Sequence, residues 1–280
     1  MKMKKIFIFI FVMFNSLLLY GIDETPNLMK LLNKSKDSAL SRYYPSAIVG
    51  KYRYSVNFSV ASYNQIIQED NFYYTESGAV NINLKNIILA GGVVFKQFSM
   101  GNYGENEISG IIGSRVIEKM ALDAGLSFTF RGYSYTSEYN DSILNDLNST
   151  YFDLGFSAGI EVYKGINIGV GLENILNSEA VDGSFSDAVN IVIAAGYDLK
   201  DYGVLSIGFS RKEGANNALF SYGISYNQLY AQFDYDFNSI IGTIVLRSDI
   251  FQRIKVDFSG SIKYINELGT VYSGGINLKY

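Results

Sequence analysis

The chain contains no cysteine and no histidine. The absence of cysteine excludes disulfides, thiolate catalysis, thiolate metal sites and an N-terminal lipoprotein anchor. The absence of histidine excludes Ser-His-Asp catalysis and histidine-ligated metal sites. Asp234 and Asp236 share one face of a predicted strand, but a polar wall explains this pair more simply than acid/base chemistry. We therefore expect no catalytic residues, no metal site, no cofactor and no enzymatic activity.

Proline is also scarce. Both prolines, Pro26 and Pro45, lie in the first 45 residues, so the rest of the chain lacks the residue that removes a donor from a β-ladder. Tyrosine (23) and phenylalanine (19) are abundant, whereas the mean hydropathy is only +0.08, which is what alternating strands give. The net charge is −4 without a Lys/Arg cluster beyond the N-terminus, so we expect no nucleic-acid partner.

Two neighbouring segments, Met120 to Tyr133 and Thr150 to Tyr163, alternate between apolar and polar residues. Period-2 alternation predicts strands with one apolar and one polar face. Strands of globular proteins are usually about 5 or 6 residues long, whereas a tilted strand needs about 9 to 11 residues to cross a bilayer. The polar faces carry glycine, serine and charges of both signs, as the wall of a barrel lumen does. The alternative is a secreted, soluble β-sandwich.

The same alternation continues through residues 51–280 and predicts about 14 strands, an even number, as in single-chain outer-membrane barrels. Short turns, such as 85–86, 164–165 and 227–228, alternate with longer loops, which we expect at 64–71, 99–107, 134–149, 174–187 and 212–217. A soluble sandwich gives no reason for this asymmetry. The predicted fold class is all-β, a transmembrane antiparallel β-barrel of about 14 strands with a short N-terminal plug or hatch segment.

The first residues predict export. Lys2, Lys4 and Lys5 precede an apolar run from Ile6 to Tyr20, so residues 1–21 have the layout of a secretory signal peptide. The run is shorter than the roughly 20 residues of a membrane-spanning helix, so we expect cleavage near Gly21 rather than an anchor. An exported barrel of this kind is expected in the outer membrane of a diderm bacterium.

Residues 22–50 form a separate segment ahead of the barrel. Leu28, Leu31 and Leu32 have helical spacing, which predicts a short helix. The residues that follow are neither alternating nor helical in pattern. The sequence leaves open whether this segment fills the lumen or is a periplasmic tail.

The last strand ends in an aromatic residue and has apolar residues at alternate positions, namely Tyr272, Ile276, Leu278 and Tyr280. This pattern resembles the signal that outer-membrane insertion machinery recognises. We therefore expect this machinery and the lipid of the outer membrane as partners. Tyrosines near strand ends, among them Tyr54, Tyr163 and Tyr226, predict an aromatic girdle.

Together these features resemble the FadL-type long-chain fatty-acid channels and the related PorV/PorQ-type outer-membrane proteins; an uncharacterised spirochaete-type member would also fit. Members of that group carry an Asn-Pro-Ala motif before the first strand. Here Tyr44, Pro45, Ser46 and Ala47 stand in that place, keeping the proline but lacking the Asn and the first Ala. The segments Tyr222 to Tyr226, Tyr230 to Tyr235 and Ile168 to Ile175 are similar to three further strand motifs of the group.

The resemblance implies uptake of hydrophobic small molecules such as long-chain fatty acids, with the segment around Tyr44 to Ala47 as a hatch. Two alternatives remain open. One is a PorV-like component of a secretion system that acts through its extracellular loops, and the other is a general diffusion porin.

The predicted inward positions are of two kinds. Some are small, namely Gly113, Gly125, Gly155, Gly159, Gly169, Gly171, Gly196, Gly208 and Gly223. They either leave room for a plug or permit bends in the strands, and we favour bends. Others are charged with mixed sign, which predicts internal ion pairing rather than a selectivity ring of one sign. These are Arg53, Arg115, Asp123, Arg131, Asp153, Glu161, Glu173, Asp198, Asp234, Asp236, Arg247, Lys255 and Asp257.

Overall fold

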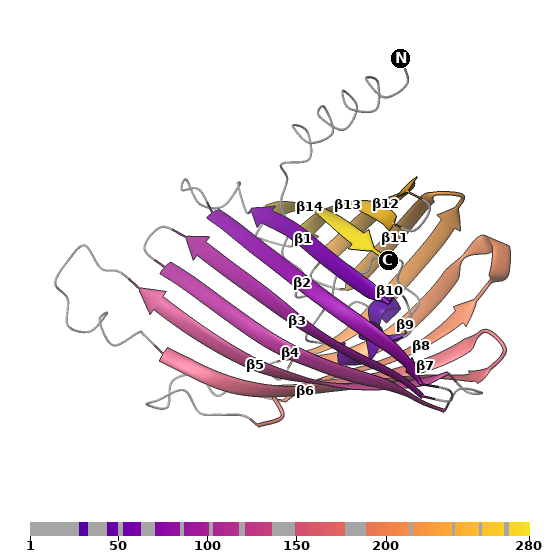
Figure 1. The fold of residues 1–280 in the computed structure, drawn as a ribbon, viewed down its shortest axis with the longest axis horizontal. Helices are drawn as coiled ribbons and strands as arrows, with labels where there is room; N and C mark the ends of the chain where they lie inside the picture. The colour runs from indigo at the N-terminus through magenta and orange to yellow at the C-terminus, as the bar shows by residue number, and fades with distance from the viewer. Residues whose placement is uncertain are drawn as a thin grey trace, which may run out of the picture.

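The computed structural model describes residues 28–32, 44–49, 53–62, 71–84, 87–100, 103–117, 121–135, 149–176, 189–212, 215–236, 239–251, 254–265 and 269–280 (Figure 1). The predicted signal peptide, residues 1–21, lies outside the described residues, as does most of 22–50. The described part of that segment consists of two short helical pieces. These are α2 (Leu28–Leu31), which agrees with the predicted short helix, and the 3₁₀ turn η1 (Pro45–Ile48).

The rest of the described chain is a closed antiparallel barrel of 14 strands, as the alternation predicts. Each strand pairs with its neighbours in sequence, and β1 closes the ring by pairing with β14. The strands are β1 (Tyr54–Ser62), β2 (Asn71–Leu84), β3 (Ile87–Met100), β4 (Tyr103–Ile117), β5 (Leu122–Tyr135), β6 (Ser149–Tyr163), β7 (Ile166–Glu173), β8 (Asn190–Asp198), β9 (Val204–Lys212), β10 (Ala215–Tyr226), β11 (Leu229–Asp236), β12 (Ser239–Phe251), β13 (Ile254–Ile265) and β14 (Gly269–Lys279).

The two faces of the wall differ as the alternation requires. In β5 and β6, Phe128 and Phe130 are exposed on the outside, whereas Asp123, Ser127 and Asp153 are buried on the lumen side. The same division continues around the ring. Exposed apolar side chains on the outside include Val56, Ile82, Val93, Ile108, Ile168, Ile193, Ile207, Phe233, Ile244, Ile262 and Leu278. A belt of this kind in contact with water would be very unfavourable, and a lipid environment removes that cost.

The barrel has two distinct ends. We call the end where β1 begins and β14 finishes the terminal end, and the opposite one the loop end. Exposed tyrosines gather at strand ends and turns of the terminal end, including Tyr54, Tyr163, Tyr197, Tyr202, Tyr226 and Tyr280. At the junction of the first and last strands, the rings of Tyr54 and Tyr280 lie 6.0 Å apart. This arrangement agrees with the predicted aromatic girdle.

The connections at the loop end are less uniform than the sequence predicts. The chain is long between β1 and β2 (63–70), β5 and β6 (136–148) and β7 and β8 (174–189). The predicted loops at 99–107 and 212–217 are wrong, because β3 runs to Met100, β4 begins at Tyr103, and only residues 213–214 separate β9 from β10. Most residues assigned to these loops belong to strands.

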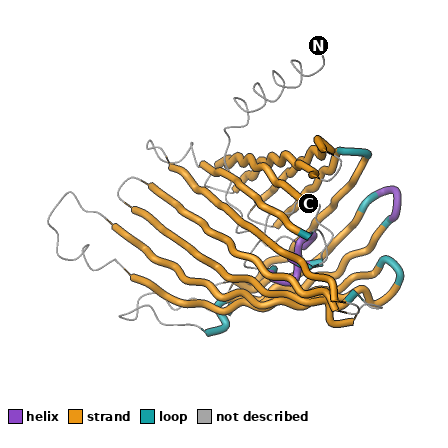
Figure 2. The backbone as a smooth tube through the Cα atoms, viewed as in Figure 1, coloured by secondary structure: helices purple, strands orange, loops and turns teal. Residues whose placement is uncertain are grey.

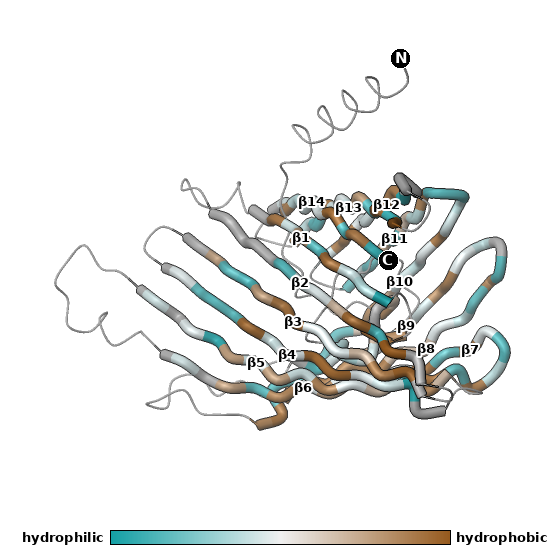
Figure 3. Tube along the Cα trace, in the orientation of Figure 1, coloured by the Kyte–Doolittle hydropathy of each residue, from teal (hydrophilic) through white to brown (hydrophobic). Residues whose placement is uncertain are grey.

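Strands β2 to β6 have 14 or 15 residues each, whereas β7 and β11 have 8. At about 3.4 Å per residue, the longer strands exceed what is needed to cross a bilayer core. Hydrophilic residues occupy the parts of β3 to β5 toward the loop end, and hydrophobic residues follow toward the terminal end (Figure 3). Outward positions near the loop end are polar too, as Gln97 and Asn106 show. Alternation therefore fades there, which explains why 99–107 resembles a loop in sequence.

Candidate functional site

The N-terminal pieces α2 and η1 lie against the lumen side of the barrel wall (Figure 2). Helix α2 contacts β6, β7, β9 and β10, and η1 contacts β3 to β6. Leu28, Leu31 and Leu32 of the first piece and Tyr44 ahead of the second are almost fully buried. They form one apolar cluster with Val192, Ala194 and Leu219 of the wall.

A second apolar cluster holds the end of the η1 segment. Ile48 and Val49 are buried against Val94, Ile111 and two alanines of β2 and β3. The segment is thus anchored on two sides of the lumen. Since fully burying a leucine or isoleucine contributes about 1.5 to 3 kcal/mol, burial of these side chains gives the segment a defined position.

Glycines of the wall make this close approach possible. A Cβ on Gly125 would lie 2.5 Å from the carbonyl carbon of Pro45, and one on Gly113 would lie 2.8 Å from Ile48. On the other side, a Cβ on Gly159 would lie 2.9 Å from the carbonyl oxygen of Leu31. Gly169, Gly196 and Gly208 are in similar contact with leucines of residues 28–32. At these positions the structure gives the close approach of the N-terminal segment, through its backbone at Gly125 and Gly159 and through side chains at the others, as the reason for glycine rather than a bend.

Few polar contacts tie the segment to the wall. The backbone N–H of Ser46 donates to Oγ of Ser157 at 2.9 Å, and the two hydroxyl oxygens lie 2.7 Å apart. The hydroxyl of Ser206 donates to Sδ of Met29 at 3.6 Å. All four side chains are buried. The Ser46–Ser157 pair is therefore a specific, buried polar contact between η1 and β6.

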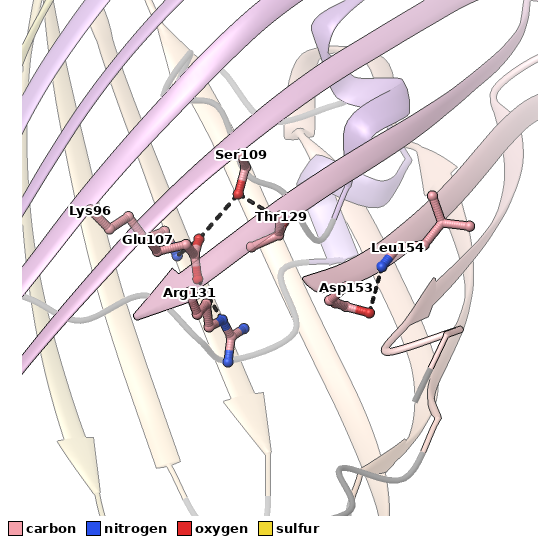
Figure 4. Close-up of polar contacts among 7 residues, drawn as sticks. All are labelled: Lys96, Glu107, Ser109, Thr129, Arg131, Asp153 and Leu154. Carbon is pink, nitrogen blue, oxygen red and sulfur yellow. Dashed lines mark hydrogen bonds and ion pairs between the residues drawn. The ribbon is translucent and has the colours of Figure 1, made fainter. Parts of the chain in front are cut away.

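Buried charges of both signs line the lumen nearer the loop end (Figure 4). Glu107 accepts from Nε of Arg131 at 2.8 Å, and Nζ of Lys96 lies 3.7 Å from the same carboxylate. The hydroxyl of Ser109 donates to Glu107 at 3.3 Å and lies 2.8 Å from that of Thr129. Neither Lys96 nor Glu107 is among the predicted charged residues of the lumen, and Glu107 falls within the predicted loop 99–107.

Further ion pairs lie toward the terminal end. Arg115 forms a bidentate ion pair with Asp123, in which Nε donates to Oδ1 at 2.7 Å and Nη2 donates to Oδ2 at 2.9 Å. Asp257 forms an ion pair with Lys279, and Nε of Arg247 lies 3.9 Å from Oδ2 of Asp257. These contacts confirm the predicted internal pairing for Arg115, Asp123, Arg131, Arg247 and Asp257. Arg53 and Lys255 lie beside the buried Asn81 and Lys279, on the lumen face as expected, and are exposed at the terminal end.

The carboxylates of Asp234 and Asp236 are held by neighbouring groups. Asp234 accepts from the hydroxyl of Ser221 and from the amide of Gln232. Asp236 accepts from the backbone and the hydroxyl of Ser239, at 2.6 and 3.0 Å. The Asp234 carboxylate therefore stabilises the barrel wall, and the Asp236 carboxylate links the end of β11 to the start of β12. Among the described residues, no group of three or more acidic side chains is placed to hold a metal ion.

The predicted site residues separate into two places. The hatch motif, Tyr44, Pro45, Ser46 and Ala47, lies at η1 against β3 to β6. The C-terminal pattern lies on β14, where Ile276 pairs with Phe58 and Leu278 with Val56 of β1. Leu278 and Tyr280 are exposed on the outside. No helix in the described part of the chain has the length and apolarity that a membrane span requires.

No protein-family model matches the sequence, and no curated protein matches it. Solved structures do share the fold. The toluene transporter TbuX of Ralstonia pickettii is similar over 93% of this chain and 98% of its own, with a TM-score of 0.54 and 10% identity. The monoaromatic hydrocarbon channel CymD is similar over 90% of this chain and 91% of its own, with a TM-score of 0.55 and 8% identity. The chain thus shares the fold of these two channels, a closed antiparallel β-barrel, in agreement with the fold that the resemblance implies.

Proposed function

We propose that the protein is an outer-membrane channel for the uptake of hydrophobic small molecules, such as long-chain fatty acids. The observation that carries this proposal is the packing of residues 28–32 and 44–49, which are buried on the lumen side against glycines of the wall. The names of the two hydrocarbon channels that share the fold support the substrate class. In this proposal residues 22–50 are a plug, with Tyr44, Pro45, Ser46 and Ala47 as its hatch motif.

The lining of the lumen favours a closed hydrophobic channel over a diffusion porin. Two apolar clusters fix the segment, and the buried carboxylates of Glu107 and Asp123 are paired with arginines. A polar solute that enters the lumen therefore contacts apolar side chains of the segment. An ion finds no ring of side chains with the same charge that would select it. Passage requires movement of the segment.

The location follows from the same proposal. Residues 1–21 direct export and are then removed. The barrel-insertion machinery recognises the C-terminal pattern of Tyr272, Ile276, Leu278 and Tyr280. In the membrane, the outward apolar belt contacts lipid. The loop end faces the outside, since short turns of outer-membrane barrels lie in the periplasm. Substrate then enters at the loop end and leaves past the N-terminal segment.

Planar-bilayer conductance tests the plug. We expect the mature protein to be closed most of the time and a variant lacking residues 22–50 to conduct steadily. Steady conductance of the intact protein would favour the porin alternative. Uptake of labelled hexadecanoic acid and labelled toluene by cells of a diderm host that produces the protein tests the substrate class. Uptake of neither compound above that of cells without the protein contradicts the proposal.

A further inference from the structure

A row of polar side chains crosses the seam where the barrel closes. Ser77 of β2 pairs with Asn57 of β1, Asn57 pairs with Asn277 of β14, and Asn277 pairs with Asp257 of β13. Residues that pair in register share a face, and the neighbours Val56 and Phe58 are exposed on the outside. The row therefore points into the lumen.

Several polar atoms of this row are buried without a hydrogen-bond partner. These are Oδ1 of Asn57, Oγ of Ser77 and both Oδ1 and Nδ2 of Asn277, in side chains that are 3%, 6% and 3% exposed. The amide nitrogen of Asn57 reaches the carbonyl oxygen of Ile276 at 3.5 Å. A buried polar atom that lacks a partner costs roughly 1 to 3 kcal/mol, so a row of them is unfavourable unless another molecule supplies partners.

A strip of small side chains continues from this row toward the loop end. In register, the next lumen-facing level is Ser59, Gly275 and Ser259, and the level beyond it includes Ser273 and Ser261. These residues are only half-buried, whereas Gly125, Ser157 and Gly159 on the other side of the ring are buried beneath α2 and η1. The strip is therefore less covered than the part of the wall that α2 and η1 contact.

We infer that this strip and the row at its foot bind the uncharged polar end of an amphipathic substrate, a hydroxyl or a protonated carboxyl group. Such a group both donates and accepts, which matches the carbonyl oxygen of Asn57 and the complete amide of Asn277. Asp257, at one end of the row, carries a charge that Lys279 balances, and Nε of Arg247 lies 3.9 Å from the same carboxylate. The partnerless atoms of Asn57, Ser77 and Asn277 therefore belong to neutral groups. The inference rests on the proposed function and specifies where the polar end of the substrate is held.

Three labelled compounds of equal chain length test it: dodecane, 1-dodecanol and dodecanoic acid. Uptake by diderm cells that produce the full-length protein is compared for the wild type, Asn277→Leu and the matched control Asn190→Leu. Asn190 is a buried asparagine on β8, six strands away from Asn277 on β14. We expect Asn277→Leu to raise the concentration for half-maximal uptake of the alcohol and the acid about tenfold, which corresponds to about 1.4 kcal/mol. Uptake of dodecane stays unchanged, as does uptake of all three compounds by the control.

The outcomes separate the inference from the proposed function. If Asn277→Leu lowers uptake of dodecane and 1-dodecanol equally, or lowers uptake of none of the compounds, the proposed site at the seam is wrong. The proposed channel function would still stand. Failure of the wild type to take up any of the three would overturn both. Because Asn277 has no partner to lose, Asn277→Leu should melt no lower than the wild type in a heat-induced mobility shift. A lower melting temperature would indicate a structural role instead.

Discussion

At the scale of single residues, contact between the wall and the N-terminal segment depends on the lack of a side chain at Gly125. A Cβ there would lie 2.5 Å from the carbonyl carbon of Pro45, so Gly125→Ala must displace η1. Inserting a methyl group into a packed site typically costs about 1 to 3 kcal/mol. We expect the open fraction in bilayer recordings to rise about tenfold, since tenfold corresponds to about 1.4 kcal/mol.

The control for Gly125→Ala is Gly110→Ala. Gly110 lies on the outside of β4, and a Cβ there would meet no atom within 4 Å. This variant should conduct like the wild type. An unchanged open fraction in Gly125→Ala would contradict the role of η1 in closing the lumen.

Glu107 provides the second prediction at this scale. Its carboxylate faces both Arg131 and Lys96, and all three side chains are buried. Glu107→Gln leaves two buried cations without this charge, and removing one partner of a buried ion pair typically costs about 3 to 5 kcal/mol. We expect urea unfolding of the barrel in lipid vesicles to show a decrease in the free energy of unfolding in this range. As a control, replacing the exposed Glu76 with Gln should change the free energy of unfolding little. An equally small decrease for Glu107→Gln would show that the barrel does not need the negative charge of Glu107 for stability.

At the scale of elements, η1 and β6 offer a direct test of movement. The hydroxyl oxygens of Ser46 and Ser157 lie 2.7 Å apart, and the chain has no other cysteine to interfere with an engineered pair. In Ser46→Cys/Ser157→Cys a disulfide would tie η1 to the wall. We expect oxidation to lower uptake of labelled hexadecanoic acid at least tenfold, and a reductant to restore it.

Each single-cysteine variant serves as the control, because neither can form the tether. Full uptake by the oxidised double variant, with the disulfide verified by mass spectrometry, would show that substrate passes without movement of η1 away from β6.

The sequence predicts most elements of the barrel because each lipid-facing strand carries its own alternation. It predicts the number of strands, the tight turns and the faces of β5 and β6, where Phe128 and Asp123 lie as expected. It fails near residues 99–107, where outward positions such as Asn106 are polar because the strands extend beyond the apolar belt. It also cannot place α2 or η1, since their contacts with Gly125 and Gly159 join residues far apart in the chain.

At the scale of the whole molecule, three layers succeed one another from the outside to the axis. An apolar belt faces outward, a polar wall follows, and the N-terminal segment lies against part of that wall with apolar side chains. The described segment packs against β3 to β10, while the seam of β13, β14 and β1 presents small, half-buried serines. The strip that we infer to bind the polar end of the substrate therefore lies apart from the strands that the described segment contacts.

The belt itself gives the last prediction. Ile207 is 61% exposed in the middle of β9, and Tyr226 is 73% exposed at the terminal end of β10. In lipid, an arginine costs about 2 to 4 kcal/mol near the midplane and about 0 to 1 kcal/mol near the interface. We expect Ile207→Arg to lower the free energy of unfolding in vesicles by the larger amount and Tyr226→Arg by the smaller. On a soluble sandwich both exposed substitutions would fall within about 0.5 kcal/mol of the wild type. Equal, small effects at the two positions would therefore contradict a membrane-embedded belt.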